Sequence, residues 1–171
     1  MADYLWVSDE QLTAALADKG IYFVLGKSSD HVTLPMEPES LIAGLAKSQD
    51  ARLRLALIPL FLNRPELSEY TWLVSKKIGK DGLITLQCYY QAALWLQALY
   101  HDQINVLIGE QPTLPDLFSS MLMGEVSAEP EQNLRVLARR HQQLTRNSVN
   151  WLGTYHHAVE VWLRGLELQR G

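Results

Sequence analysis

Cysteine is nearly absent from this chain: Cys88 is the only one among 171 residues. An intramolecular disulfide is therefore excluded, and we expect Cys88 to be a reduced, buried thiol in a cytoplasmic protein. The first residues also lack the positive segment and the apolar segment of a signal peptide. Export is not expected.

Basic residues are missing from a long central stretch. Residues 81–134 contain no lysine or arginine, whereas residues 135–171 contain six arginines and only two glutamates. The net charge of −4 argues against a protein that coats nucleic acid, because such proteins are usually basic. The change of sign along the chain predicts an acidic surface followed by a basic one, which favours binding to a charged partner.

A membrane-spanning run is missing as well. The uncharged segment over residues 83–100 is interrupted by Thr85, Gln87, Gln91 and Gln97. Polar side chains are costly in lipid, so the segment is better suited to a buried helix in a domain core. No membrane partner is expected.

Hydrophobic periodicity predicts a mainly α protein. Its 47% apolar content fits one domain over residues 1–171 with a sizeable core. We expect a bundle of six or seven helices around a central apolar helix over about 83–108. A long C-terminal helix is expected over about 128–168, with a break near 147–150 as the alternative to a continuous helix. Residues 21–34 predict a small N-terminal β-hairpin, because β-branched and aromatic residues flank a turn of glycine and serines.

Local signals predict several helix ends. Ser8 and Gln11 form a capping-box pattern at the start of a short first helix. Pro38 suits the first position of a later helix. Within the apolar helix over residues 52–62, Pro59 is expected to cause a kink, because proline removes a backbone donor.

Two motif-like patterns fail on spacing or on the number of ligands. Gly20 and Gly26 precede a lysine and a serine, but five residues separate the glycines where a phosphate-binding loop needs four. His156 and Glu160 share one helical face, yet two ligands are too few for a zinc site. We therefore expect no metal and no cofactor.

One short pattern resembles a known family. Five residues separate Arg135 from His141, which resembles the Arg-x4-6-His pattern of the HEPN family, helical ribonucleases that act on RNA without metal. The resemblance covers seven residues and implies an RNA-cleaving enzyme or a component of a toxin–antitoxin pair. It implies that His141 is a general acid or base and that Arg135 stabilises the phosphorane charge, in a cleft formed by a dimer. The alternative is that His141, on the apolar seam of the C-terminal helix, is a core residue.

A polar stripe on the predicted C-terminal helix suits a docking surface. It consists of Arg135, Arg139, Gln142 or Gln143, Arg146 and Asn150. Arginine side chains bind carboxylates and phosphates through paired hydrogen bonds. Trp162 belongs to a set of aromatic residues of the kind that anchor protein interfaces. The predicted binding residues are therefore Arg135, Arg139, Arg146, Asn150 and Trp162.

Three functions remain open from the sequence. The leading hypothesis is a non-catalytic interaction module or regulatory subunit that binds a partner protein or a second copy of the chain, with nucleic acid as a less favoured ligand. The second is the ribonuclease that uses Arg135 and His141. The third is a helical small-molecule binder whose pocket contains Gln87, Gln91 and Gln97. The first predicts an exposed patch of aromatics and arginines, the second a shared cleft, and the third a closed pocket lined by glutamines.

Overall fold

The computed structural model describes residues 7–21 and 35–170, and within these ranges the chain is helical and contains no strand. The prediction of a mainly α protein is therefore confirmed. The predicted hairpin over about 21–34 falls on residues 22–34, which lie outside the described residues, and Ile21 is buried without belonging to a strand. The helices are α1 (Asp9–Asp18), α2 (Pro38–Lys47), α3 (Ala51–Leu55), α4 (Leu57–Asn63), the 3-10 helix η1 (Pro65–Leu67), α5 (Ser68–Lys77), α6 (Lys80–Leu99), α7 (His101–Ile108), α8 (Ser119–Leu122), α9 (Pro130–Thr145) and α10 (Trp151–Arg170).

The α-helices outnumber the six or seven that were predicted. Residues 7–21 and 35–170 contain ten of them. The difference arises largely because three predicted helices are each divided. The helix predicted over residues 52–62 is divided into α3 and α4, the central helix into α6 and α7, and the C-terminal helix into α9 and α10.

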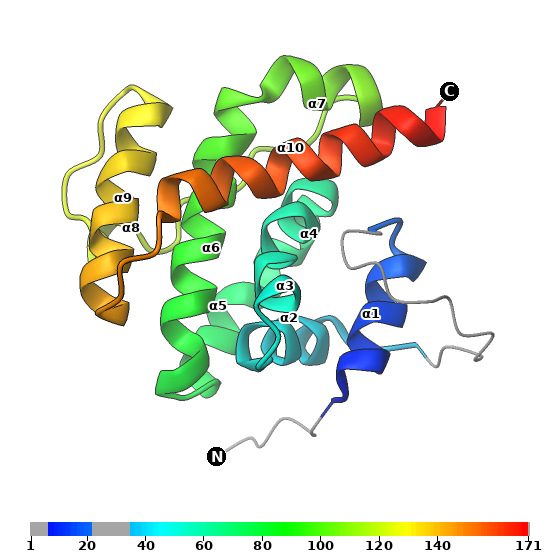
Figure 1. Ribbon diagram of the computed structural model, residues 1–171, viewed down its shortest axis with the longest axis horizontal. Helices are drawn as coiled ribbons and strands as arrows, with labels where there is room; N and C mark the ends of the chain where they lie inside the picture. The colour runs from blue at the N-terminus through cyan, green and yellow to red at the C-terminus, as the bar shows by residue number, and fades with distance from the viewer. Residues whose placement is uncertain (1–6, 22–34, 171) are drawn as a thin grey trace.

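Helix α6 is the central element of the fold (Figure 1). It packs against α2, α4, α9 and α10. Leu86, Cys88 and Leu96 are fully buried at 0% exposure, and the helical repeat places Cys88 on the side opposite to Leu86. This burial explains why the run over residues 83–100 contains no charge. In the described ranges no helix, α6 included, has the length and apolar character needed to cross a membrane.

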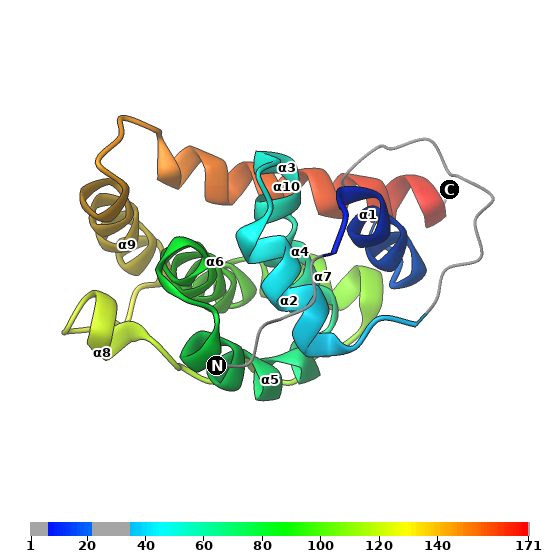
Figure 2. The ribbon, with the colours of Figure 1, turned by 90° about the horizontal axis from the view of Figure 1, so that it is seen from below.

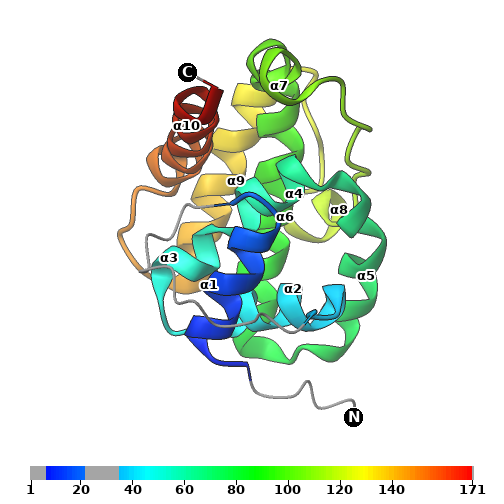
Figure 3. The same cartoon turned by 90° about the vertical axis from the view of Figure 1, so that its right-hand side faces the viewer.

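The other helices lie on two sides of α6 and α4. Figures 2 and 3 show α10 on one side, and α5 and α8 on the opposite side. In Figure 1, α10 crosses α6 and α4 and then continues beside α7, and it contacts all three of these helices. The C-terminal helix therefore connects regions of the bundle that are far apart in the sequence.

The central helix is shorter than predicted, because it ends at Leu99. Tyr100 adopts φ −102° and ψ 20°, and a separate helix begins at the next residue. The Tyr100 hydroxyl lies 2.8 Å from Nδ1 of His156 on α10, and it donates to Oε1 of Glu160 at 3.3 Å. The bend thus accompanies contacts with α10 that the apolar pattern of the sequence does not reveal.

The predicted C-terminal helix is also two helices, and the break falls at residues 146–150, where the alternative placed it. Arg146 adopts the left-handed region, with φ 55° and ψ 39°, which ends the hydrogen-bonding pattern of α9. Asn150 caps the next helix, because its Oδ1 accepts a hydrogen bond from the N–H of Gly153 at 3.0 Å. The chain therefore turns here and brings the start of α10 onto α9.

Other helix ends follow the predicted local signals. Ser8 Oγ accepts from the N–H of Gln11 at 3.1 Å, and the Gln11 side chain accepts from the N–H of Ser8 at 2.9 Å, which completes the capping box. Pro38 is the first residue of α2. The kink expected at Pro59 takes the form of the break between α3 and α4 at Ala56, in the turn preceding the proline.

Residues 109–118 form a loop without helix or strand, and side chains of α6 hydrogen-bond to its backbone. Gln97 is buried, and its Oε1 accepts a hydrogen bond from the N–H of Leu114 at 2.9 Å. The same amide donates through Nε2 to the carbonyl of Pro112 at 2.9 Å. One glutamine side chain therefore satisfies a donor and an acceptor of a backbone segment that has no helix or strand to pair with.

Two further side chains of α6 hold the same segment. Gln91 Oε1 accepts from the N–H of Phe118 at 3.0 Å, and its Nε2 donates to Asp116 at 3.1 Å. The Tyr90 hydroxyl donates to the carbonyl of Pro115 at 2.7 Å. The buried glutamines of α6 are thus engaged in fixing a loop, whereas the third functional hypothesis placed them around a ligand.

Candidate docking pocket

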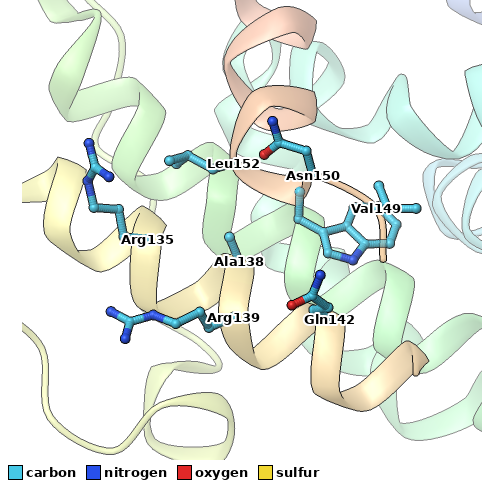
Figure 4. A pocket seen from close by; sticks show the side chains of 8 residues that line it. Arg135, Ala138, Arg139, Gln142, Val149, Asn150 and Leu152 are labelled. Carbon is cyan, nitrogen blue, oxygen red and sulfur yellow. The ribbon is translucent and has the colours of Figure 1, made fainter. Parts of the chain in front are cut away.

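A pocket of about 330 Å³ lies between α9 and the start of α10 (Figure 4). It exists because the chain turns after α9, since a continuous helix would carry residues 149–152 away from residues 135–142. The lining residues are Arg135, Ala138, Arg139, Gln142, Val149, Asn150, Trp151 and Leu152. Three of the five predicted binding residues are therefore brought together here.

Two arginines supply the charge of the pocket. Arg135 and Arg139 lie one turn apart on α9, and in Figure 4 the side chain of Arg135 extends upward and that of Arg139 to the left. The guanidinium of Arg135 is 3.7 Å from Oε1 of Glu131, an exposed pair of the kind that contributes about 0–1 kcal/mol. Arg139 forms no ion pair with any of the described residues. Its donors therefore remain available to an external anion.

Apolar side chains lie beside the arginines. Ala138 of α9 and Leu152 of α10 are partly buried, and Val149 in the turn is 40% exposed. Figure 4 shows Leu152 between Arg135 and Asn150. The pocket therefore offers an apolar contact area next to cationic groups, a combination found at protein interfaces.

The amide side chains of the pocket add mainly hydrogen-bond donors. The Oδ1 of Asn150 is used in capping α10, so the hydrogen-bonding group that it has left is the amide nitrogen. Gln142 is exposed on α9 and also lines the pocket. With two guanidinium groups and two amides, donors outnumber acceptors, and this excess favours an anionic ligand.

His141 is a core residue in the structure. It is 1% exposed, its ring stacks on Trp151 with 3.6 Å between centroids, and its Nδ1 shares a hydrogen bond with the Tyr155 hydroxyl at 2.6 Å. Burial lowers the pKa of His141 to about 3, so the imidazole is neutral at neutral pH. Arg135, in contrast, is exposed and lines the pocket. The two side chains of the HEPN-like pattern therefore do not share a cleft.

Two other predicted binding residues lie outside the pocket. Trp162 is 4% exposed, so its indole is part of the core and not of the docking surface that was predicted. The face of α10 that carries it packs against the bundle, as Tyr155 at 0% exposure also shows. Arg146 is exposed in the turn but does not line the pocket. Among the large apolar side chains exposed in the described ranges, the one aromatic is Trp72 on α5, so the expected aromatic patch beside the arginines is not found there.

The histidine and glutamate pair of α10 belongs to a network that joins three helices. Nε2 of His156 lies 3.0 Å from Oε2 of Glu131 on α9, and its Nδ1 lies 2.8 Å from the Tyr100 hydroxyl. Burial and the neighbouring carboxylate of Glu160 raise the pKa of Tyr100 to about 12, so the phenol stays protonated. Among the described side chains, no three potential metal ligands form a cluster. The network therefore has the character of a structural connection.

Comparisons with known proteins give no relative for this chain. No protein-family model matches it, no curated protein matches it, and no solved structure matches it. The function of the pocket must therefore be inferred from its geometry and charge.

Four lining residues were not predicted as a binding site from the sequence: Ala138, Val149, Trp151 and Leu152. All four are apolar or aromatic, and three of them lie in the turn or in the first residues of α10. The available signal was the alternative break near 147–150, because only a break there brings these side chains back onto α9.

Proposed function

We propose that the protein is a non-catalytic interaction module that binds an acidic segment of a partner protein in the pocket between α9 and α10. The observation that carries this proposal is that Arg135 and Arg139 line one pocket together with the apolar side chains of Ala138, Val149 and Leu152. Arginine side chains bind carboxylates through paired hydrogen bonds, and an apolar wall accommodates a neighbouring aliphatic side chain.

The surroundings of the pocket favour a peptide over a nucleic acid. Glu131 lies 3.7 Å from Arg135, so the basic surface ends at a carboxylate on this side of the pocket. The net charge of the whole chain is −4, and residues 81–134 contain no basic residue that could extend a phosphate-binding track. A short carboxylate segment needs only the two arginines, which fits the extent of the pocket.

The burial of His141 supports a role without catalysis at this site. An imidazole with 1% exposure and a pKa of about 3 is neither accessible to a substrate nor readily protonated near pH 7. Its stacking on Trp151 instead supports the wall of the pocket from the core side. A passive docking surface agrees with this arrangement.

The proposal can be tested with a defined probe. A fluorescent peptide with three glutamates around one leucine is titrated with the full chain, and its anisotropy is compared with that of the same peptide carrying glutamine in place of glutamate. We expect the acidic peptide to bind more tightly. Arg139→Gln should weaken that binding about twofold to fivefold, which corresponds to the loss of an exposed ion pair.

Arg164→Gln is the matched control, because Arg164 is an exposed arginine on α10 that does not line the pocket. It should leave the affinity for the acidic peptide unchanged. Equal losses for the two variants would show that binding depends on net charge alone and would contradict the proposal. Equal affinities for the acidic and neutral peptides would contradict it as well.

A single-stranded RNA oligonucleotide with the same net charge as the acidic peptide tests the alternative that the pocket binds nucleic acid. If RNA binds more tightly and its affinity falls steeply with salt, phosphate is the preferred anion and the peptide proposal is wrong. We expect the peptide to be preferred at physiological ionic strength.

A further inference from the structure

A second pocket, of about 380 Å³, lies at the junction of α6, α7 and the loop that follows α7. Its volume is within the range of about 300–1,000 Å³ that is typical of small-molecule sites. Every residue that lines it falls between Leu94 and Thr113, so it shares no residue with the docking pocket of α9 and α10.

The electrostatic environment of this pocket is negative. It lies within the stretch over residues 81–134 that contains no lysine or arginine, and Glu110 contributes a carboxylate to its lining. The C-terminal turns of both α6 and α7 border the pocket, through Ala98 and Asn105 among others. The C-terminal end of a helix carries a partial negative charge, which favours a cation nearby.

One basic side chain, that of Arg170, contacts α7 outside this pocket. The guanidinium of Arg170 donates to the carbonyl of Val106 at 2.8 Å. Val106 does not line this pocket but a smaller one between α7 and the end of α10. The lining itself therefore carries no permanent positive charge, and His101 is the one titratable group in it besides Glu110.

The wall of the pocket is apolar and aromatic. Leu94, Trp95 and Ile104 contribute to it, and Trp95 is only 6% exposed. An indole attracts both apolar groups and cations, the latter through the electron density of its ring. The buried amide of Gln97 is already bonded to the loop, so Glu110 supplies the one carboxylate of the lining, with the side chains of Asn105 and Thr113 as further polar groups.

We propose that this pocket binds a small organic cation, in which an ammonium group contacts the Glu110 carboxylate and an apolar body packs against Trp95 and Ile104. Gly109 positions the carboxylate, because its φ of 80° turns the chain after α7 and places Glu110 at the rim. The site is independent of the docking function proposed for α9 and α10.

Three probes of similar size test the assignment of charge: 2-phenylethylamine, 2-phenylethanol and phenylacetate. Each is titrated into the full chain by calorimetry at about pH 8, where histidine is ordinarily neutral and the primary amine remains protonated. We expect the amine to bind about tenfold more tightly than the alcohol, as a charge-assisted hydrogen bond provides, and phenylacetate to bind most weakly. Equal affinities for amine and alcohol, or no binding by any probe, would overturn the proposal.

Two variants locate the binding. Glu110→Gln should reduce the affinity for the amine about tenfold and change that for the alcohol less than about twofold. Ala98→Leu should weaken both probes, because Ala98 is exposed and its enlargement fills the pocket without disturbing the core. Ala51→Leu is the control, since it makes the same change at an exposed helical position outside the pocket.

The results separate this site from the docking pocket. Arg139→Gln should leave the affinity for the amine unchanged, so the failure of one proposal does not imply the failure of the other. If Ala98→Leu and Ala51→Leu bind the amine equally well, the amine binds elsewhere and the assignment to this pocket is wrong.

Discussion

His141 shows how one residue in the core makes stability depend on pH. Its pKa falls from 6.5 to about 3 because burial penalises the charged imidazole. The unfolded chain therefore binds a proton that the folded chain resists. The contribution of the neutral His141 to the free energy of unfolding is fully present above about pH 6.5. It is lost as the pH falls from there toward 3, at about 1.4 kcal/mol per pH unit at most.

We predict that His141→Gln removes this part of the acid sensitivity. The variant has a lower free energy of unfolding at pH 7, because it loses the stacking on Trp151, but the difference from the wild type shrinks by about 2 kcal/mol between about pH 6 and pH 4. Urea denaturation at a series of pH values measures it. Parallel pH profiles for the two proteins would contradict the burial of a neutral imidazole.

Residue by residue, the spacing on one helix could predict the candidate site only in part. The spacing of four residues places Arg135 and Arg139 on one face of α9, whereas Asn150 reaches the same pocket only because the chain turns after α9. The apolar seam indicated a core position for His141 as the alternative to a catalytic role, and the structure places both His141 and Trp162 in the core. Which face of a helix is covered depends on the element that packs against it, and here that element is α10 after its turn.

At the scale of elements, the loop over residues 109–118 depends on α6 for its conformation. Its backbone donors and acceptors are bonded to glutamine and tyrosine side chains where a regular element would bond to itself. A buried backbone N–H that loses its partner costs about 1–3 kcal/mol. The loop should therefore be sensitive to single substitutions on the helix beneath it.

We predict that Gln91→Leu lowers the free energy of unfolding by about 1–3 kcal/mol, because the N–H of Phe118 loses its acceptor at a buried position. Thermal or chemical denaturation followed by circular dichroism measures the change. Gln132→Leu is the control, since Gln132 is an exposed glutamine on α9, and it should stay within about 0.5 kcal/mol of the wild type. Equal effects of the two substitutions would show that the loop does not rely on α6.

Helix ends were predictable where a single residue causes them. The capping box of Ser8 and Gln11 and the start of α2 at Pro38 both follow from local chemistry and are confirmed. The division at Tyr100 was not predicted, because no proline or glycine marks it and the contacts that accompany it lie on α10. The break at residues 146–150 lies between these cases, since Asn150 is a good cap whereas Arg146 is an unusual residue for a left-handed turn.

At the scale of the whole molecule, the charge pattern of the sequence corresponds to two different sites. The stretch without lysine or arginine contains the pocket of α6 and α7, which we assign to a cation. The arginine-rich stretch after it contains the pocket of α9 and α10, which we assign to carboxylates. The two stretches meet at several points, Glu131 with Arg135 and Val106 with Arg170 among them, but the two pockets share no lining residue, so each pocket keeps its own sign.

The organisation of the chain as one domain remains a prediction, and the position of α6 allows a direct test. Leu96 is fully buried at 0% exposure, and Leu96→Ala should cost about 2–5 kcal/mol in the free energy of unfolding. Leu99→Ala is the control on the same helix, because Leu99 is 39% exposed and should cost about 1 kcal/mol or less. Since α6 contacts helices from both the N-terminal and the C-terminal parts of the chain, the loss should destabilise both together.

Unfolding of Leu96→Ala is therefore expected to give one transition, shifted by the same amount in far-UV circular dichroism and in tryptophan fluorescence. The first signal reports all the helices, and the second includes Trp72 on α5, Trp95 on α6 and Trp162 on α10. Two separate transitions would mean that the helices before α6 unfold independently of those after it. In that case residues 1–171 would form more than one folding unit, and the single domain inferred from length and composition would be wrong.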